Sequence, residues 1–409
     1  MMQAPERKWY RKGHLMRNLR DYLKPWLFVL LVLLLGAGII FLKERTYEWI
    51  FVYYMSYDND LSGYGETILR DLKKGVVNSK VAVVVQADFI DRKGMRRIAL
   101  YKAYGRPKRK ETFLKSENSA DPAELKKYFR WVQEKWKARN YCIVFLDHGG
   151  RLNDMCLDEK PFADRNEDQS LASRKWLAST EAGAIVADFN EKVGGKVRLL
   201  FLQQCGRATI QNLYNFLDAA EHILASPLIV GAPNTYYTKT LAASARDPNM
   251  TGEILARTIM QEDEHYTLYT LIRNSELKRL SERLTRVLKP FEQVSNLDPP
   301  PACSQLFEYA DEKFYDLKSY LQALSSANGG IAAEEIEGFL DWCDERLIVS
   351  KAVRGPTPLA ESHCSGLSVY VPSSQEQIER YDFLPLHQQT ALARVIKRKA
   401  SANAVNAAN

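Results

Sequence analysis

Two stretches decide the fold of this chain: YCIVFLDHGG, residues 141–150, and VRLLFLQQCGRA, residues 197–208. Each begins as a short apolar run bounded by turn residues, which is typical of a strand in a parallel sheet that is covered on both faces. The first run ends at His148 and the second at Cys205. Open α/β sheets bind their ligands at the carboxyl ends of the strands. If the two strands are neighbours, the histidine and the cysteine lie side by side at that edge.

The order of the other predicted elements extends this pair to an α/β fold. Two more apolar runs, a helix between them and a further helix that opens at Pro122 precede the His148 strand. Strands and helices in alternation favour a mostly parallel central sheet. We therefore expect a sheet domain over residues 48–250. A mainly helical extension that returns to a final strand, GLSVYVP, follows over residues 251–372, and residues 373–409 form a C-terminal segment with a disordered tail.

Charge is distributed unevenly along the chain. The 409 residues have 46% hydrophobic content, which is enough for a large core. The formal net charge of +7 lies mostly in residues 1–24, where seven Lys or Arg residues face two acidic ones. The globular body is therefore not basic, which argues against nucleic acid as a partner. Residues 92–110 are also basic and could form a nucleic-acid strip, but their alternation with apolar residues favours a solvated hairpin.

An apolar segment follows the basic N-terminus. It reads WLFVLLVLLLGAGIIFL, residues 26–42, and contains no charge. At about 1.5 Å per residue it spans about 25 Å, the short end of the range for a transmembrane helix. A cleavable secretory signal is the alternative, but bulky residues and Lys43 stand where a small-residue cleavage site is needed. We interpret residues 25–43 as a transmembrane anchor, and the basic flank predicts a cytoplasmic N-terminus.

The residue types at the two strand ends indicate nucleophilic catalysis. Attack by cysteine on a carbonyl needs a thiol, a base within hydrogen-bond reach and N–H donors for the oxyanion. Glycines follow both reactive residues and let the chain turn tightly, so the backbone N–H groups of Gly149 and Cys205 can form an oxyanion hole. The alternative is one buried histidine and one buried cysteine without a catalytic role. The six cysteines are scattered and contain no CxxC pair, so no metal site is expected.

Five segments, in order, resemble the motif series of the clostripain family of cysteine peptidases: FVYYMSYDNDLSG, VAVVVQAD, DHGG, LLFLQQCGRATIQNLYNFLDAAEHILAS and GLSVYVP. The resemblance implies a caspase-like three-layer sandwich, with His148 as the catalytic base and Cys205 as the nucleophile that forms an acyl-enzyme. Some relatives need calcium. The acidic residues between 154 and 168 lack the spacing of an EF-hand, so we expect no cofactor.

The chain departs from this family at two places that bear on substrate choice. Relatives usually have Asp two residues before the nucleophile, where it helps to select Arg or Lys, whereas this chain has Gln203. Relatives also tend to have acidic residues where this chain has an apolar run that includes Leu228. An Arg side chain without a counter-charge loses several kcal/mol on desolvation. We therefore predict that Gln203 and Leu228 contact the substrate and that the residue before the scissile bond is neutral, in particular apolar.

These features together predict a membrane-anchored cysteine endopeptidase that acts as a monomer on protein or peptide substrates. The resemblance and the charge pattern imply a single-pass protein of a bacterial inner membrane, with the catalytic domain outside the cytoplasm. Caspase-like bacterial proteases also suggest a role in antiviral defence, through activation of a gasdermin-like protein partner. Two alternatives stay open: an Arg/Lys-specific clostripain-like protease, and a non-catalytic pseudo-peptidase that binds peptides.

Overall fold

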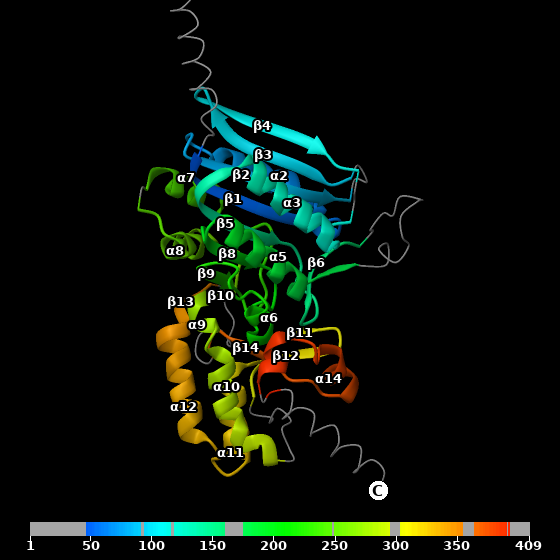
Figure 1. Cartoon of the computed structure of the whole chain (residues 1–409), viewed down its shortest axis with the longest axis vertical. Coiled ribbons are helices and arrows are strands. Elements are labelled where there is room, and N and C mark those ends of the chain that lie inside the picture. The colour runs from blue at the N-terminus through cyan, green and yellow to red at the C-terminus, as the bar shows by residue number, and fades with distance from the viewer. Residues whose placement is uncertain are drawn as a thin grey trace, which may run out of the picture. The chain divides into compact units, whose positions relative to one another are not determined.

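Nine strands form one central sheet in the part of the chain that the structure describes (Figure 1). The structure is a computed structural model, and it describes residues 46–90, 94–115, 118–159, 175–247, 249–294, 303–354, 364–390 and 392. The strand order is β13-β10-β9-β8-β5-β1-β2-β3-β4. The strands are β1 (Thr46–Tyr57), β2 (Val81–Phe89), β3 (Arg96–Ala103), β4 (Arg106–Phe113), β5 (Lys137–Leu146), β8 (Val197–Gln203), β9 (His222–Ala225), β10 (Leu268–Arg273) and β13 (Ile348–Val353).

The sheet is mixed, whereas the sequence predicts a mostly parallel one. In the centre, β1 runs parallel to β2, and β8 runs parallel to both β5 and β9. Antiparallel strands extend the sheet on both sides, β3 and β4 beyond β2, and β10 and β13 beyond β9. On the β4 side the connection explains the difference, because a two-residue turn can join only antiparallel strands. Tyr104 and Gly105 form this turn with φ angles of 50° and 73°, which confirms the predicted hairpin.

Helices cover both faces of the sheet and so make three layers (Figure 1). One face carries α2 (Gly65–Gly75), α7 (Tyr237–Arg246) and α8 (Gly252–Glu262), and the other carries α3 (Pro122–Lys135), α5 (Ser179–Lys192) and α6 (Ile210–Tyr214). The side chains of β1 alternate between the two cores, with Phe51 in the first and Val52 in the second. Because both faces are buried, β1 is apolar almost throughout, as the sequence shows.

Residues after 250 contribute strands as well as helices. Two strands of this region, β10 and β13, pair in the central sheet, and β14 belongs to a second sheet of order β11-β12-β14. Short apolar runs fit a strand and a buried helix equally well, so the helical spacing of this region did not reveal β10. The remaining elements are η1 (Asp60–Tyr64), β6 (Asp154–Leu157), β7 (Trp176–Ala178), α9 (Asn274–Leu277), α10 (Leu280–Leu288), η2 (Lys289–Gln293), β11 (Gln305–Tyr309), β12 (Glu312–Asp316), α11 (Leu317–Ala327), α12 (Ala333–Trp342), η3 (Cys343–Leu347), β14 (Ser368–Tyr370), α14 (Gln375–Tyr381) and α15 (Pro385–Gln389).

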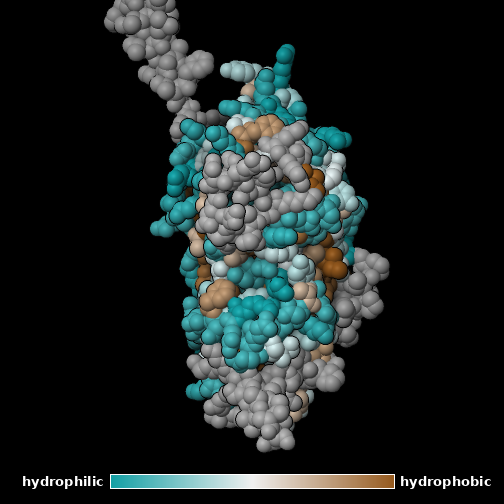
Figure 2. All heavy atoms as spheres, turned by 90° about the vertical axis from the view of Figure 1, so that its right-hand side faces the viewer, coloured by the Kyte–Doolittle hydropathy of each residue, from teal (hydrophilic) through white to brown (hydrophobic). Residues whose placement is uncertain are grey.

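The surface is predominantly hydrophilic on the face that Figure 2 shows, where hydrophobic residues occur in separate patches. The edge strand β4 reads RPKRKETF and is almost entirely exposed. Charged side chains on an edge strand oppose pairing with the edge of another sheet. The basic stretch of the sequence thus has a structural role at this edge.

The predicted membrane anchor, residues 25–43, and the C-terminal tail lie outside the described residues. Within the ranges given above, no helix combines the length and the apolar composition that a membrane span needs. A compact unit begins at Tyr47, directly after the start of β1.

Candidate active site

The two strands that carry the reactive residues are direct neighbours. β5 and β8 pair in parallel, with Leu146 opposite Gln203 at their carboxyl ends. His148 and Cys205 follow these ends by two residues each, and both line one cavity of about 220 Å³. The sequence-based expectation of adjacent strands is confirmed. The cavity is lined by Tyr57, Asp60, Leu61, Tyr64, Leu146, Asp147, His148, Gln203, Cys205, Val230, Gly231, Ala232 and Asn234.

The Cys205 thiol is half-buried against the loop that follows β9. The backbone N–H of Val230 donates to its sulfur at 3.4 Å, and the sulfur lies 3.7 Å from the carbonyl oxygen of the same residue. Burial raises the pKa of the Cys205 thiol, although the Val230 N–H and the positive charge of Arg207 act in the opposite direction. The thiol is therefore held in its protonated form more firmly than a free cysteine.

The His148 imidazole has an acidic partner that sequence reasoning did not find. Its Nε2 lies 2.6 Å from Oδ1 of Asp60, at the start of η1. The adjacent Asn59 fixes this turn, because its side chain accepts a hydrogen bond from Leu61 N and donates one to Asp147 Oδ1 at 2.8 Å. The signal in the sequence was the polar run DND, residues 58–60, which ends β1 at the same edge of the sheet as the two reactive residues.

Asp147 does not orient the histidine beside it. Its carboxyl group is buried and accepts hydrogen bonds from Asn59 and from the Leu157 N–H. Burial raises the pKa of Asp147 well above its usual range. The side chain thus connects the ends of β1, β5 and β6.

Two further polar residues of the nucleophile loop hold the site together. Gln204 donates from Nε2 to the carbonyl oxygen of His148 at 2.8 Å. Arg207 is 1% exposed and donates to four backbone carbonyl oxygens, those of Cys205, Gly150, Arg151 and Asp154, at 2.7–3.1 Å. Nothing in the sequence separated this buried guanidinium from a surface arginine. It connects the loop after β5 to the loop after β8.

The two predicted oxyanion donors belong to backbone segments in close contact. A Cβ atom at Gly149 would lie 2.1 Å from the carbonyl oxygen of Cys205. Only glycine permits this approach, because real Cβ atoms essentially never come within 3.0 Å of another heavy atom in this way. The glycine after His148 is therefore needed to bring the two loops together.

The two residues predicted to contact substrate have different surroundings. Gln203 is buried and lines the cavity, and its side chain is hydrogen-bonded to Asn234, Tyr236 and Tyr237. Leu228 does not line the cavity, because its side chain packs with Leu268 and Leu306 in a separate apolar cluster. Val230 lines the cavity instead. Position 230 of this loop thus faces the cavity and position 228 does not, which the sequence could not show.

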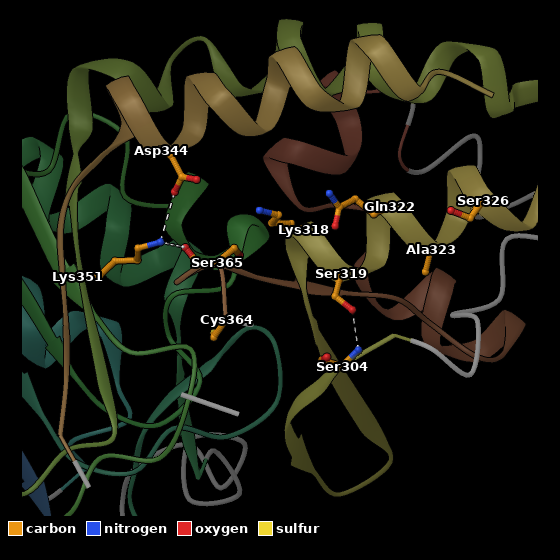
Figure 3. A pocket seen from close by; sticks show the side chains of 10 residues that line it. All are labelled: Ser304, Lys318, Ser319, Gln322, Ala323, Ser326, Asp344, Lys351, Cys364 and Ser365. Carbon is orange, nitrogen blue, oxygen red and sulfur yellow. Dashed lines mark hydrogen bonds and ion pairs between the residues drawn. The ribbon is translucent and has the colours of Figure 1, made fainter. Parts of the chain in front are cut away.

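A larger cavity, of about 580 Å³, lies away from the dyad between α11, η3 and β13 (Figure 3). Its polar lining includes Lys351, whose Nζ is paired with Asp344 Oδ1 and the Ser365 carbonyl oxygen. Burial raises the pKa of the Cys364 thiol in its wall to about 12, so this cysteine is a poor nucleophile. Among the described residues, no group of three or more His, Cys, Asp or Glu side chains is arranged to hold a metal ion.

Comparisons with known proteins agree with this geometry. The clostripain family model matches residues 53–393. No match is found among curated proteins. An inactive zymogen C11 protease from Parabacteroides distasonis has a similar structure, with a TM-score of 0.65, 18% identity, and coverage of 85% of this chain and 99% of that one.

Two structures from Bacteroides thetaiotaomicron share the fold as well. One is a secreted C11 cysteine protease in complex with an irreversible peptide inhibitor, with a TM-score of 0.61, 14% identity, and coverage of 84% of this chain and 99% of that one. The other is a secreted C11 cysteine protease called iotapain, with a TM-score of 0.66, 13% identity, and coverage of 85% and 100%.

Proposed function

Because this chain belongs to the clostripain family and is a cysteine endopeptidase, we propose that His148 and Cys205 are its catalytic dyad. The observation that carries this assignment is the pairing of β5 with β8, which ends both strands at one cavity. All six cysteines lie in the described part of the chain, and Cys205 is the only one that lines this cavity.

Peptide cleavage then proceeds by acyl transfer. The Cys205 sulfur attacks the carbonyl carbon of the scissile bond, and the thiol proton passes to His148. The carbon–nitrogen bond breaks as His148 gives this proton to the leaving amine. Water attacks the resulting thioester, His148 accepts its proton, and the sulfur leaves and is reprotonated. Since burial raises the thiol pKa, proton transfer accompanies the attack instead of preceding it.

Asp60 supports this proton transfer as a positioning residue. An ionised carboxylate only accepts hydrogen bonds, so the contact at 2.6 Å assigns the proton to Nε2 of His148 and leaves Nδ1 as the base. The same carboxylate stabilises the imidazolium that forms during attack. We assign the oxyanion hole to the backbone N–H groups of Gly149 and Cys205, which the close contact of the two loops supports.

We also propose that the substrate residue before the scissile bond is neutral. Gln203 stands in the cavity where relatives usually have a carboxylate. Tyr64 lines the cavity at 40% exposure, and Ile229, at 63% exposure, directly precedes the lining residue Val230. A peptide substrate gains apolar contact there without an ionic anchor.

The proposal also includes the cellular setting. Residues 25–43 anchor the enzyme in a bacterial inner membrane as a single span, and the catalytic unit acts on one protein partner of the gasdermin-like kind outside the cytoplasm. The support is the uncharged run over residues 26–42 behind a basic flank.

The dyad is tested by labelling with an electrophilic peptide ketone, followed by intact-mass spectrometry and by turnover of fluorogenic peptides. We expect one label per chain, lost in Cys205→Ala together with all turnover. Cys364→Ala is the matched control. Burial raises the pKa of this half-buried thiol to about 12, so we expect Cys364 to remain unlabelled in the wild-type chain and its replacement to change neither labelling nor turnover. Peptide binding without labelling or turnover would support the pseudo-peptidase alternative, and preferred cleavage after Arg or Lys would support the clostripain-like one.

A further inference from the structure

A buried carboxylate lies behind the floor of the catalytic cavity. Asp263 is 0% exposed. One of its oxygens accepts from Asn234 Nδ2 at 2.7 Å and from the Tyr269 hydroxyl at 2.9 Å, and the other accepts from the N–H groups of Thr235 and His265 at 3.1 and 3.3 Å. Four donors hold this group in place, so it is a fixed acceptor that no substrate can reach.

This carboxylate dictates the direction of the two amides in front of it. Because Asp263 only accepts, Asn234 must turn its NH₂ group toward it and its Oδ1 toward Gln203. Gln203 must then donate from Nε2, which it does to Asn234 Oδ1 and to the Tyr237 hydroxyl at 3.1 Å. The remaining oxygen, Gln203 Oε1, accepts from the Tyr236 hydroxyl at 2.7 Å.

All four amide hydrogens of this pair are therefore committed. Gln203 donates both of its amide hydrogens, to Asn234 and to Tyr237. Asn234 donates one amide hydrogen to Asp263 and the other to the His265 carbonyl oxygen at 3.4 Å or the Tyr269 hydroxyl at 3.3 Å. Each amide oxygen accepts one of these hydrogen bonds and keeps a second lone pair. Only Gln203 and Asn234 of this network line the cavity. These two residues thus offer oxygen acceptors to a substrate, without a free N–H and without a negative charge.

We propose that the side chain before the scissile bond is a primary amide, with glutamine preferred; this rests on the proposed function. An amide side chain donates two hydrogens to the free lone pairs of Gln203 and Asn234. A carboxylate at this position would meet the same lone pairs and be repelled. An ammonium or guanidinium would lose its hydration, and the two carboxyl groups of the lining are already engaged, Asp60 by His148 and Asp147 by Asn59 and the Leu157 N–H. The cavity, at about 220 Å³, is below the usual size of small-molecule sites and suits one side chain.

The test compares peptides that differ only at this residue, on the purified full-length chain. Glutamine and methionine form the central pair, because methionine has a similar length and shape but no N–H. We expect kcat/KM for the glutamine peptide to exceed that for the methionine peptide by about tenfold, the size of one or two net hydrogen bonds. Lysine, arginine and glutamate peptides are expected to be cleaved more slowly than both.

Two variants test whether the preference for glutamine over methionine arises from Gln203 and Asp263. Gln203→Met removes the amide from the floor and is expected to bring the Gln/Met ratio to one or below. Asp263→Asn removes the group that dictates the amide directions and is expected to lower the ratio several-fold. Because both peptides are measured on one preparation, the ratio does not depend on the fraction of folded protein, and Gln203→Met serves even if Asp263→Asn fails to fold.

The outcomes separate this inference from the assignment of the dyad. Equal or faster cleavage after methionine or a basic residue, or a ratio that Gln203→Met leaves unchanged, would overturn the amide preference while the peptidase activity stands. Absence of turnover for every peptide, with no labelling of Cys205 by the electrophilic ketone, would remove both.

Discussion

At the scale of single residues, Cys205 is subject to opposing influences. Burial raises the pKa of its thiol, whereas the Val230 N–H and the charge of Arg207 favour the thiolate, and burial prevails. The resting enzyme is therefore protected from alkylation and oxidation, because the thiolate is the reactive form.

The pH dependence of alkylation follows from this shift. A pKa above the ordinary value of about 8.5 means that the thiolate fraction is small at neutral pH and rises about tenfold per pH unit. We expect the inactivation rate with iodoacetamide to increase steadily from pH 7 to pH 9 without a plateau. Stopped samples assayed for residual activity give this rate, with the denatured chain as the reference for an unshifted thiol. A plateau near pH 7 would contradict the shift.

At the scale of elements, the site depends on how the loops after β5 and β8 are joined. Their strands place the dyad, but the loops themselves have little regular structure. The four carbonyl oxygens that Arg207 bonds belong to both loops. Loss of this guanidinium would take a hydrogen-bond donor from backbone oxygens of both segments, which is costly.

Replacement of Arg207 tests this connection. Arg207→Met removes the guanidinium donor from four carbonyl oxygens, and we expect the free energy of unfolding to fall by about 2–4 kcal/mol. In the folded fraction we expect kcat to fall at least about tenfold with little change in KM. We also expect the alkylation profile of Cys205 to move to higher pH, because a positive charge near the thiolate is lost.

Arg130→Met is the matched control for this replacement, since Arg130 is exposed on α3. It should change none of these quantities. Arg207→Lys keeps the positive charge but cannot donate to four carbonyl oxygens at once, so it should restore part of the alkylation profile and less of the stability. An unchanged alkylation profile in Arg207→Met would limit Arg207 to a purely structural role.

At the scale of the whole molecule, the described residues form a catalytic unit that begins at Tyr47. All residues that line the catalytic cavity, from Tyr57 to Asn234, belong to this unit. The proposed anchor precedes it in the sequence. Membrane attachment and catalysis are therefore expected to be separable.

Deletion of residues 1–45 tests this separation. We expect the full-length chain in the membrane fraction and the truncated chain in the soluble fraction, with kcat/KM for peptides changed by less than about twofold. Immunoblots of fractionated cells and peptide assays give the two readouts. A full-length chain that is already soluble would contradict the anchor.

Sequence patterns predicted the parts of the fold that depend on burial and strand order. The long apolar runs of β1, β2, β5 and β8 exist because both faces of the sheet are covered, and the shared cavity of His148 and Cys205 follows from where two of them end. The antiparallel strands β10 and β13 were missed, since short runs do not distinguish a strand from a helix. Asp60, Arg207 and Asp263 were missed as well, because their roles depend on contacts between distant segments.

The hydrogen-bonded pair of Gln203 and Asn234 also has an evolutionary consequence. A mutation that restored a carboxylate at position 203 would bring it against the oxygen of Asn234, whose orientation Asp263 holds fixed. Two acceptors would then face each other in a buried site, with no donor between them. A single substitution at Gln203 is therefore not expected to produce specificity for Arg or Lys. The effects of substitutions at positions 203, 234 and 263 depend on one another, so Asn234 or Asp263 must change before an acidic residue at position 203 becomes favourable.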